Sequence, residues 1–262
     1  MTINSAKDTP IVLETKHLNV HVPGRILIND LNWQVKKGER WCLIGRNGAG
    51  KSTLLRIIAG VQANSSAGEI NWLGQALTEY KSEELAKVRA YAEQFAVGGV
   101  GLRAIDIILA AQWPWHLDAS SSQEQAQAAL SACDVAHLAN AEWQILSGGE
   151  RQRVSLAACF AQNTRAILLD EPTSHLDIGH QVALLNTLVQ QSNACEQTMI
   201  ASMHDIGLIQ RGFTHALLLM NDGSYLAGSL SEVINPTNLE RALGHPISTA
   251  QTVAGQTIYI PA

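Results

Sequence analysis

A nine-residue segment, Gly45-Arg-Asn-Gly-Ala-Gly-Lys-Ser-Thr53, constrains the fold of this 262-residue chain more than any other feature. It fits the pattern G-x-x-x-x-G-K-[ST], and it lies between an apolar stretch expected to be a strand, Arg40–Ile44, and a run with helical spacing that begins at Lys51. Glycines let such a loop curl so that its backbone N–H groups point inward at an anion, and the helix start adds its positive dipole end. The segment therefore predicts a strand–loop–helix unit that binds phosphate groups. A glycine-rich turn without a ligand is the alternative.

The residues of this loop take separate roles in that interpretation. The ammonium of Lys51 reaches the β and γ phosphates of a nucleoside triphosphate, and the hydroxyl of Ser52 is a ligand for Mg²⁺. The residues expected to contact the nucleotide are Gly45, Arg46, Asn47, Gly48, Ala49, Gly50, Lys51, Ser52 and Thr53.

Two carboxylates, Asp170 and Glu171, follow the apolar stretch Ala166–Leu169. Continuous apolar character is typical of a central parallel strand that is covered on both faces, and ligands of such sheets bind at the carboxyl ends of the strands. Asp170 is therefore placed to hold Mg²⁺ through water, and Glu171 to orient an attacking water or to accept its proton. Pro172 is expected to keep the backbone of Glu171 extended. Two solvated acids at the end of a strand are the alternative.

Strand and helix patterns alternate through most of the chain, which predicts an α/β fold with a mostly parallel sheet. Besides the segments named above, strands are expected at Ile11–His21, Asn32–Lys36, Thr198–Ser202, Ala216–Met220 and Ser224–Ala227, and a helix at Gly179–Gln191. The Ala- and Gln-rich middle, roughly 83–142 and helical at Gln123–Ala136, has the character of a helical insertion. The stretch 236–262 has its own Pro and Gly punctuation and is expected to pack as a C-terminal appendage.

Composition limits the kind of protein. Lys and Arg number 18 against 23 Asp and Glu, so the net charge of −5 argues against nucleic acid as the main partner. No run approaches the roughly 18 apolar residues of a membrane span, and the first residues lack a secretory pattern. The sequence has four cysteines, which are far apart and form no CxxC pair: Cys42, Cys133, Cys159 and Cys195. We therefore expect them to be free thiols in a reducing cytosol.

A second anion-binding element is predicted at Leu146-Ser-Gly-Gly-Glu-Arg-Gln-Arg153, where a serine and paired glycines precede an apparent helix, Val154–Ala161. A chain with one phosphate loop does not need a second anion-binding element for its own nucleotide. Two copies arranged head to tail would use both elements, because the Ser147 segment of one copy would cap the phosphate held by Lys51 of the other. In order with the phosphate loop and the acidic pair, this segment resembles the LSGGQ or LSGGE signature of the ATP-binding-cassette (ABC) ATPases. The resemblance covers nearly the whole chain.

The resemblance implies a fold, cofactors and a dimer. The fold is a P-loop NTPase of the α/β class in a single domain, 1–262, with a mostly parallel central sheet, an N-terminal antiparallel β part, and an inserted helical subdomain at about 83–160 that carries the signature. The cofactors are ATP and Mg²⁺. In the head-to-tail dimer two ATP molecules are sandwiched, and the signature of one copy caps the γ-phosphate held by the other. The residues implied in this contact are Ser147, Gly148, Gly149 and Glu150, with Asp177 of the family's D-loop.

Two more positions match the family, and one departs from it. His204 follows an apolar strand and resembles the switch histidine, which senses the γ-phosphate and helps to position water. Gln94 resembles the Q-loop glutamine, which contacts Mg²⁺ and water and links to the membrane subunit, although Glu93 replaces the usual apolar or Pro residue. Val22 stands where the family has an aromatic residue that stacks on adenine, and the neighbouring His21 is a candidate substitute. We therefore expect weaker nucleotide affinity and looser base discrimination.

The sequence has one phosphate loop and shows no long coiled-coil pattern and no membrane helices, which excludes tandem-cassette, chromosome-maintenance and fused-exporter relatives. The kind of protein that remains is a detached ATPase subunit of a multi-chain transporter. Asp170–Gln181 and Glu232–Glu240 resemble the importers of iron–siderophore, haem and vitamin B12. The resemblance implies a peripheral protein at the cytoplasmic face of a bacterial-type inner or plasma membrane. Its partners would be integral permease subunits and, indirectly, a periplasmic or surface substrate-binding protein, with no nucleic acid.

Two other functions are alternatives. The first is a regulatory or mechanical ABC ATPase whose membrane partners transport nothing. The second is a small-molecule kinase, which leaves Ser147–Glu150 and His204 unexplained. The aromatic pair in Trp113-Pro-Trp115 either docks against a permease helix or packs inside the helical insertion.

Overall fold

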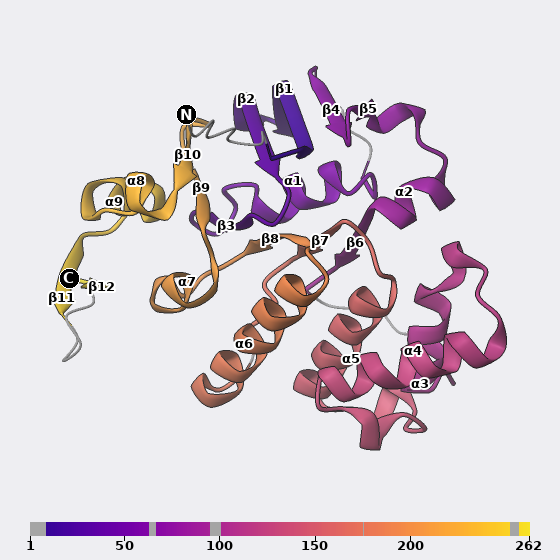
Figure 1. The fold of residues 1–262 in the computed structure, drawn as a ribbon. Helices are drawn as coiled ribbons and strands as arrows, with labels where there is room; N and C mark the ends of the chain where they lie inside the picture. Colours follow the sequence, from indigo (N-terminus) through magenta and orange to yellow (C-terminus); the bar gives the residue numbers. More distant parts are fainter. Residues whose placement is uncertain (1–8, 63–66, 95–100, 175, 252–256) are drawn as a thin grey trace, which may run out of the picture.

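The computed structural model describes residues 9–62, 67–94, 101–174, 176–251 and 257–262 of the chain (Figure 1). The strands are β1 (Ile11–Val22), β2 (Arg25–Lys36), β3 (Arg40–Ile44), β4 (Glu69–Trp72), β5 (Gln75–Ala76), β6 (Arg89–Ala92), β7 (Ala166–Leu169), β8 (Thr198–Ser202), β9 (His215–Leu219), β10 (Tyr225–Ser229), β11 (Ile247–Gln251) and β12 (Thr257–Pro261). The α-helices are α1 (Lys51–Ile58), α2 (Ser82–Val88), α3 (Ala104–Ala111), α4 (Ala119–Ala132), α5 (Gly148–Ala161), α6 (Ile178–Ala194), α7 (Ile206–Gly212), α8 (Leu230–Val233) and α9 (Pro236–Leu243). Single 3₁₀ turns lie at Leu77–Glu79, Trp113–Trp115, Ala136–Leu138 and Trp143–Ile145.

The central sheet has six strands in the order β10-β9-β3-β8-β7-β6. Every neighbouring pair from β9 to β6 is parallel, and β10 is antiparallel at one edge. A second sheet, β2-β1-β4-β5, is antiparallel throughout. The expected mostly parallel central sheet and N-terminal antiparallel β part are thereby confirmed.

Apolar side chains cover both faces of the central sheet, because successive residues of a strand point to opposite sides. Along β3, Trp41 and Leu43 face a core shared with α1 and the N-terminal sheet, whereas Cys42 and Ile44 face a core shared with α5 and α6. Figure 1 shows these two layers on either side of the sheet. The parallel strands β3, β7 and β8 all end at one edge, where the candidate site lies.

Several individual helices and strands differ in their bounds from the sequence prediction. The range 83–160 contains β6, which pairs with β7 in the central sheet and is only four residues long. The helix expected at 123–136 is α4, which begins at Ala119 because the Asp118 carboxylate accepts the N–H groups of Ser120 and Ser121. Helix α5 begins at Gly148 rather than at 154, and β2 begins at Arg25 rather than at 32.

The C-terminal stretch forms α9 and the hairpin β11–β12. Its contact with the phosphate loop is direct, since the Arg46 N–H donates to the carbonyl of Ala242 in α9 at 3.2 Å. Within the described residues, no helix combines the length and the apolar character needed to cross a membrane.

Candidate functional site

Residues 45–50 connect the end of β3 to the start of α1, as the sequence predicts. Gly48 and Gly50 have positive φ angles of 77° and 102°, and Gly50 is the N-cap residue of α1. A Cβ at Gly45 would lie 2.8 Å from the carbonyl oxygen of Leu219. The loop therefore requires glycine twice for backbone conformation and once for close packing against the end of β9.

Lys51 lies under this loop and is 5% exposed. Its Nζ donates to the carbonyl of Gly45 at 2.8 Å and to that of Arg46 at 3.3 Å. Burial lowers the pKa of Lys51, and the negative charges of Glu171 and Asp170 oppose that change. Phosphate groups in the loop would add further negative charge beside the ammonium and would offset the cost of burying it.

Asp170 lies at the end of β7, 2% exposed, and joins two serines. Its Oδ1 accepts hydrogen bonds from the hydroxyl of Ser52 at 2.9 Å and from that of Ser202 at 2.8 Å. A serine hydroxyl and a carboxylate are oxygen ligands of the kind that Mg²⁺ prefers. The fold thus brings the predicted metal ligands Ser52 and Asp170 together.

Glu171 is the centre of a cluster of the three residues predicted to take part in catalysis. Its carboxylate accepts a hydrogen bond from Nε2 of Gln94 at 2.5 Å and is also hydrogen-bonded to Nε2 of His204. Its backbone N–H donates to the hydroxyl of Ser202 at 2.7 Å. A carboxylate fixed from two sides in this way is suited to orient a water molecule.

The backbone of Glu171 is not extended, so the expectation drawn from Pro172 is wrong. Its φ is 50°, in the left-handed region that residues other than glycine rarely adopt. The N–H bond to Ser202 and the carboxylate bonds to Gln94 and His204 fix both ends of the residue. Backbone strain held by surrounding contacts in this way is concentrated at functional sites.

Glu171, its partners Gln94 and His204, and the loop residues Lys51 and Ser52 line one pocket with a volume of about 580 Å³, whereas Asp170 and Ser202 lie outside the lining. Val22 lines the pocket, whereas His21 on the same strand does not. The described lining includes no Phe, Tyr or Trp. Gly45, Arg46 and Ala49 lie outside the lining, and the first two present their carbonyls to Lys51. The lining residues are Val22, Arg25, Leu27, Asn47, Gly48, Gly50, Lys51, Ser52, Thr53, Gln94, Glu171 and His204.

The predicted signature and D-loop residues lie apart from this pocket. Ser147 is exposed and is the N-cap of α5, where its hydroxyl accepts the Glu150 N–H at 3.3 Å and its N–H donates to the Glu150 carboxylate at 2.7 Å. Asp177 is the N-cap of α6 and accepts the N–H of His180 at 2.9 Å. None of the residues 147–150 is among those that line the pocket. Within one copy of the chain, the two predicted phosphate-binding elements are therefore separate.

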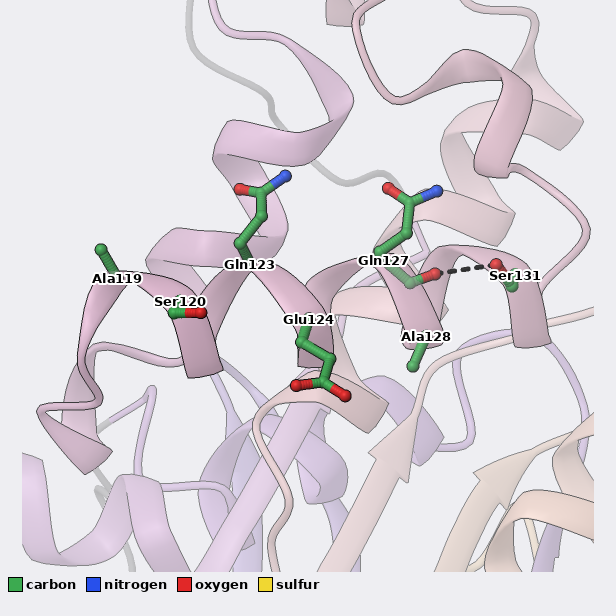
Figure 2. A pocket seen from close by; sticks show the side chains of 7 residues that line it. All are labelled: Ala119, Ser120, Gln123, Glu124, Gln127, Ala128 and Ser131. Carbon is green, nitrogen blue, oxygen red and sulfur yellow. Dashed lines mark hydrogen bonds between the residues drawn. The ribbon is translucent and has the colours of Figure 1, made fainter.

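A second hollow, about 820 Å³, lies along the outer face of α4 (Figure 2). Gln123 and Gln127 project to the same side there, and the hydroxyl of Ser131 donates to the carbonyl of Gln127 at 2.9 Å. Glu124 is the one charged side chain of the lining, which is Ala119, Ser120, Gln123, Glu124, Gln127, Ala128 and Ser131. This surface does not gather groups suited to chemistry, so the pocket at the phosphate loop is the candidate site.

Comparison with known proteins decides the family, since residues 28–174 match the sequence pattern described as ABC transporter. The chain is an ABC ATPase. HmuV of Methylobacillus flagellatus, a hemin import ATP-binding protein, is 32% identical over 244 residues, which cover 90% of this chain and 90% of that protein. FpuD of Bacillus anthracis, a petrobactin import ATP-binding protein, is 32% identical over 227 residues, which cover 85% of this chain and 83% of that protein.

A solved structure supports the same assignment at the level of the fold. It is described as an inward-facing conformation of a metal-chelate type ABC transporter, and the matching chain has a TM-score of 0.82 and 26% identity. The match covers 96% of this chain and 98% of that one. The fold class predicted from the sequence is confirmed. The family match and the import ATP-binding relatives confirm the predicted ATPase activity.

Two residues in or behind the pocket of this ABC ATPase were missed by the sequence prediction. Ser202 links Asp170 to Glu171, and the available signal was a serine at the end of an apolar strand, two residues before His204. Arg25 lines the pocket beside Val22. The only sequence signal for Arg25 was its position across the Pro-Gly turn from Val22.

Proposed function

We propose that this chain hydrolyses ATP to power an importer of an iron–siderophore, haem or vitamin B12-type substrate. The observation that carries the proposal is the pocket lined by Lys51, Ser52 and Glu171, at which Ser52 is hydrogen-bonded to the buried Asp170. The substrate class is supported by the printed roles of the relatives, which are hemin and petrobactin import. The described structure of a metal-chelate type transporter agrees with this class.

The pocket assigns residues to the phosphates and to the metal. Lys51 binds the β and γ phosphates together with backbone N–H groups of the loop 45–53, other than those of Arg46 and Ala49, which are bonded to the carbonyls of Ala242 and Arg46. Ser52, Asp170 and Gln94 are the residues that would hold Mg²⁺, and the first two already present adjacent oxygen atoms, 2.9 Å apart. Mg²⁺ supplies positive charge that stabilises the phosphoryl group during transfer.

Glu171 acts on the attacking water in this proposal. Its carboxylate orients the water and accepts its proton, while Gln94 and His204 hold the carboxylate in place. His204 is exposed at the pocket wall, where it can sense the γ-phosphate. Binding of ATP is thereby linked to the geometry of the general base.

A second copy of the chain completes the site in a head-to-tail dimer. Helix α5 has 14 residues; its N-cap is Ser147 and its first residues are Gly148, Gly149 and Glu150, and of these four Ser147 and Gly148 are exposed. Their N–H groups and the helix dipole are available to cap the γ-phosphate held by the other copy, with Asp177 nearby in the interface. Because Ser147 does not line its own pocket, the arrangement predicts that Ser147→Arg blocks ATP-dependent dimerisation without removing ATP binding by the monomer.

The membrane partners in this proposal are integral permease subunits, which the chain contacts through the Gln94 region at the cytoplasmic face. A periplasmic or surface substrate-binding protein would deliver the substrate to the permease. Trp113 is 57% exposed, whereas Trp115 is anchored by a hydrogen bond from Nε1 to the carbonyl of Gln162 at 2.6 Å. We infer that Trp113 contributes the permease contact and that Trp115 supports the turn that presents it.

The experiment that tests the importer function combines affinity capture with uptake. The tagged chain is isolated from detergent-solubilised membranes, its partners are identified, and ATP-dependent uptake of labelled haem, ferric siderophore or cobalamin is measured in vesicles that contain the complex. We expect a permease of many membrane helices and uptake of one of these ligands. Capture of membrane partners with ATP hydrolysis and no uptake of any solute would favour the regulatory ABC ATPase instead.

A further inference from the structure

The tip of the β1–β2 hairpin forms one wall of the pocket. Val22 and Arg25 are paired across the turn Pro23-Gly24, in which Gly24 has a φ of 77°. Proline followed by a glycine with positive φ is the pattern of a type II turn. Both residues that flank the turn line the pocket together with Leu27. The hairpin thus presents two aliphatic side chains and one guanidinium to a ligand held by the phosphate loop.

The guanidinium of Arg25 is held in place by Asn221, which lies outside the pocket lining. Its Nη2 donates to Oδ1 of Asn221 at 2.5 Å and lies 3.5 Å from the carbonyl oxygen of that residue. Asn221 lies between β9 and β10, and this turn is tied to β2 by the N–H of Asn29, which donates to the carbonyl of Gly223 at 2.9 Å. A Cβ built on Gly48 would be 3.9 Å from Nη1. The planar group is therefore fixed beside the phosphate loop, next to Val22.

We propose that Arg25 recognises the base of the bound nucleotide by stacking its guanidinium plane on the ring. The inference rests on ATP binding in this pocket. A guanidinium plane stacks on bases in the way that an aromatic ring does, and the described lining offers no Phe, Tyr or Trp for that purpose. Val22 and Leu27 supply the apolar contacts beside it. Lys51 and the loop N–H groups already serve the phosphates, and an aliphatic neighbour suits a base better than a phosphate.

Stacking also sets the kind of specificity. Every base has a π-face, so a stacked guanidinium binds purine nucleotides with little discrimination between them. Asn221 is a positioning residue in this account, because it acts on the base only through Arg25.

Calorimetric titration of the full chain with two ligands tests the proposal. The ligands are MgATP and the magnesium complex of inorganic tripolyphosphate, which has the phosphates but no base. For Arg25→Ala we expect about tenfold weaker binding of ATP, at the lower end of base-stacking contributions, and tripolyphosphate affinity within about twofold of wild type. Arg25→Lys should behave like Arg25→Ala towards ATP, because an ammonium has no plane to stack. Asn221→Ala should show a smaller loss, again for ATP alone.

Two controls separate the possible failures. Arg211→Ala removes an exposed arginine at the last turn of α7, which is not among the residues of the pocket lining, and should leave both affinities unchanged. Lys51→Ala should lose both ligands; if wild type and Lys51→Ala bind alike, the ATP site itself is misplaced. Wild-type ATP affinity in Arg25→Ala would overturn the role of Arg25. Equal losses for ATP and tripolyphosphate would also overturn it, since they would make Arg25 a phosphate contact.

Discussion

Ser202 is the residue whose replacement tests the geometry of the site most sharply. It is completely buried, and its hydroxyl does two things at once. It donates to Oδ1 of Asp170 at 2.8 Å and accepts the N–H of Glu171 at 2.7 Å. Ser202→Ala removes both hydrogen bonds and changes the side-chain volume very little, so any effect comes from the lost polar contacts.

The expected magnitude follows from these two contacts. A hydrogen bond to a carboxylate contributes about 1.5–3 kcal/mol, and a buried N–H left without an acceptor costs about 1–3 kcal/mol. The Ser52 hydroxyl remains bonded to Asp170, and the backbone at Glu171 can relax in part. We therefore expect the free energy of unfolding to fall by about 2–4 kcal/mol, which lowers the Tm of a chain of this size by about 5–12 °C.

The assay is thermal and urea unfolding followed by circular dichroism, with ATP turnover measured on the same preparations. Ser192→Ala is the matched control, because Ser192 is 1% exposed and its hydroxyl donates to one neutral acceptor, the carbonyl of Gln197, at 2.6 Å. The control should cost about 1 kcal/mol and leave turnover unchanged. If Ser202→Ala is no less stable than Ser192→Ala and keeps normal turnover, Ser202 does not organise Asp170 and Glu171 as described.

Three further predictions use other parts of the chain. Because the described residues that line the pocket include no Phe, Tyr or Trp, ATP and GTP should bind within about tenfold of each other in a competition titration; a larger preference for ATP would require a base contact other than stacking on Arg25. At pH 8, iodoacetamide should label native protein at the exposed Cys195 alone, since burial raises the pKa of the Cys133 and Cys159 thiols to about 12; Cys195→Ser should then abolish labelling, and rapid labelling elsewhere would contradict the described core. Replacing Trp113 and Trp115 by Ala should preserve ATP binding and reduce membrane association in a flotation assay, and normal association would remove them from the permease contact.

The phosphate loop and the parallel sheet could be predicted because their signals are local. A glycine pattern between an apolar strand and a helix can be recognised without the rest of the chain. The buried strand Ala166–Leu169 is likewise indicated by its own run of apolar residues. Strand β6 could not be predicted in the same way. It has four residues, of which Arg89 and Tyr91 are half-buried, and only its pairing with β7 makes it a strand.

The finer geometry of the site depends on contacts between distant segments. Pro172 biases Glu171 towards an extended backbone, but the bonds from Ser202, Gln94 and His204 hold it at positive φ. The bridging role of Ser202 arises from the parallel pairing of β8 with β7, which no pattern within either strand specifies. The placement of the Arg25 guanidinium beside Val22 likewise depends on the register of the β1–β2 hairpin and on Asn221, which is 196 positions away in the sequence.

Phosphate release by Glu171→Gln under saturating MgATP, measured on the full chain together with its co-purified membrane partners, tests the central claim most directly. Glutamine keeps the size of the side chain and one acceptor oxygen but cannot accept the proton of the attacking water. The account predicts that turnover falls by about 10²–10⁴-fold while ATP still binds and holds two copies of the chain together. Turnover at the wild-type rate would remove Glu171 from its role and contradict the mechanism.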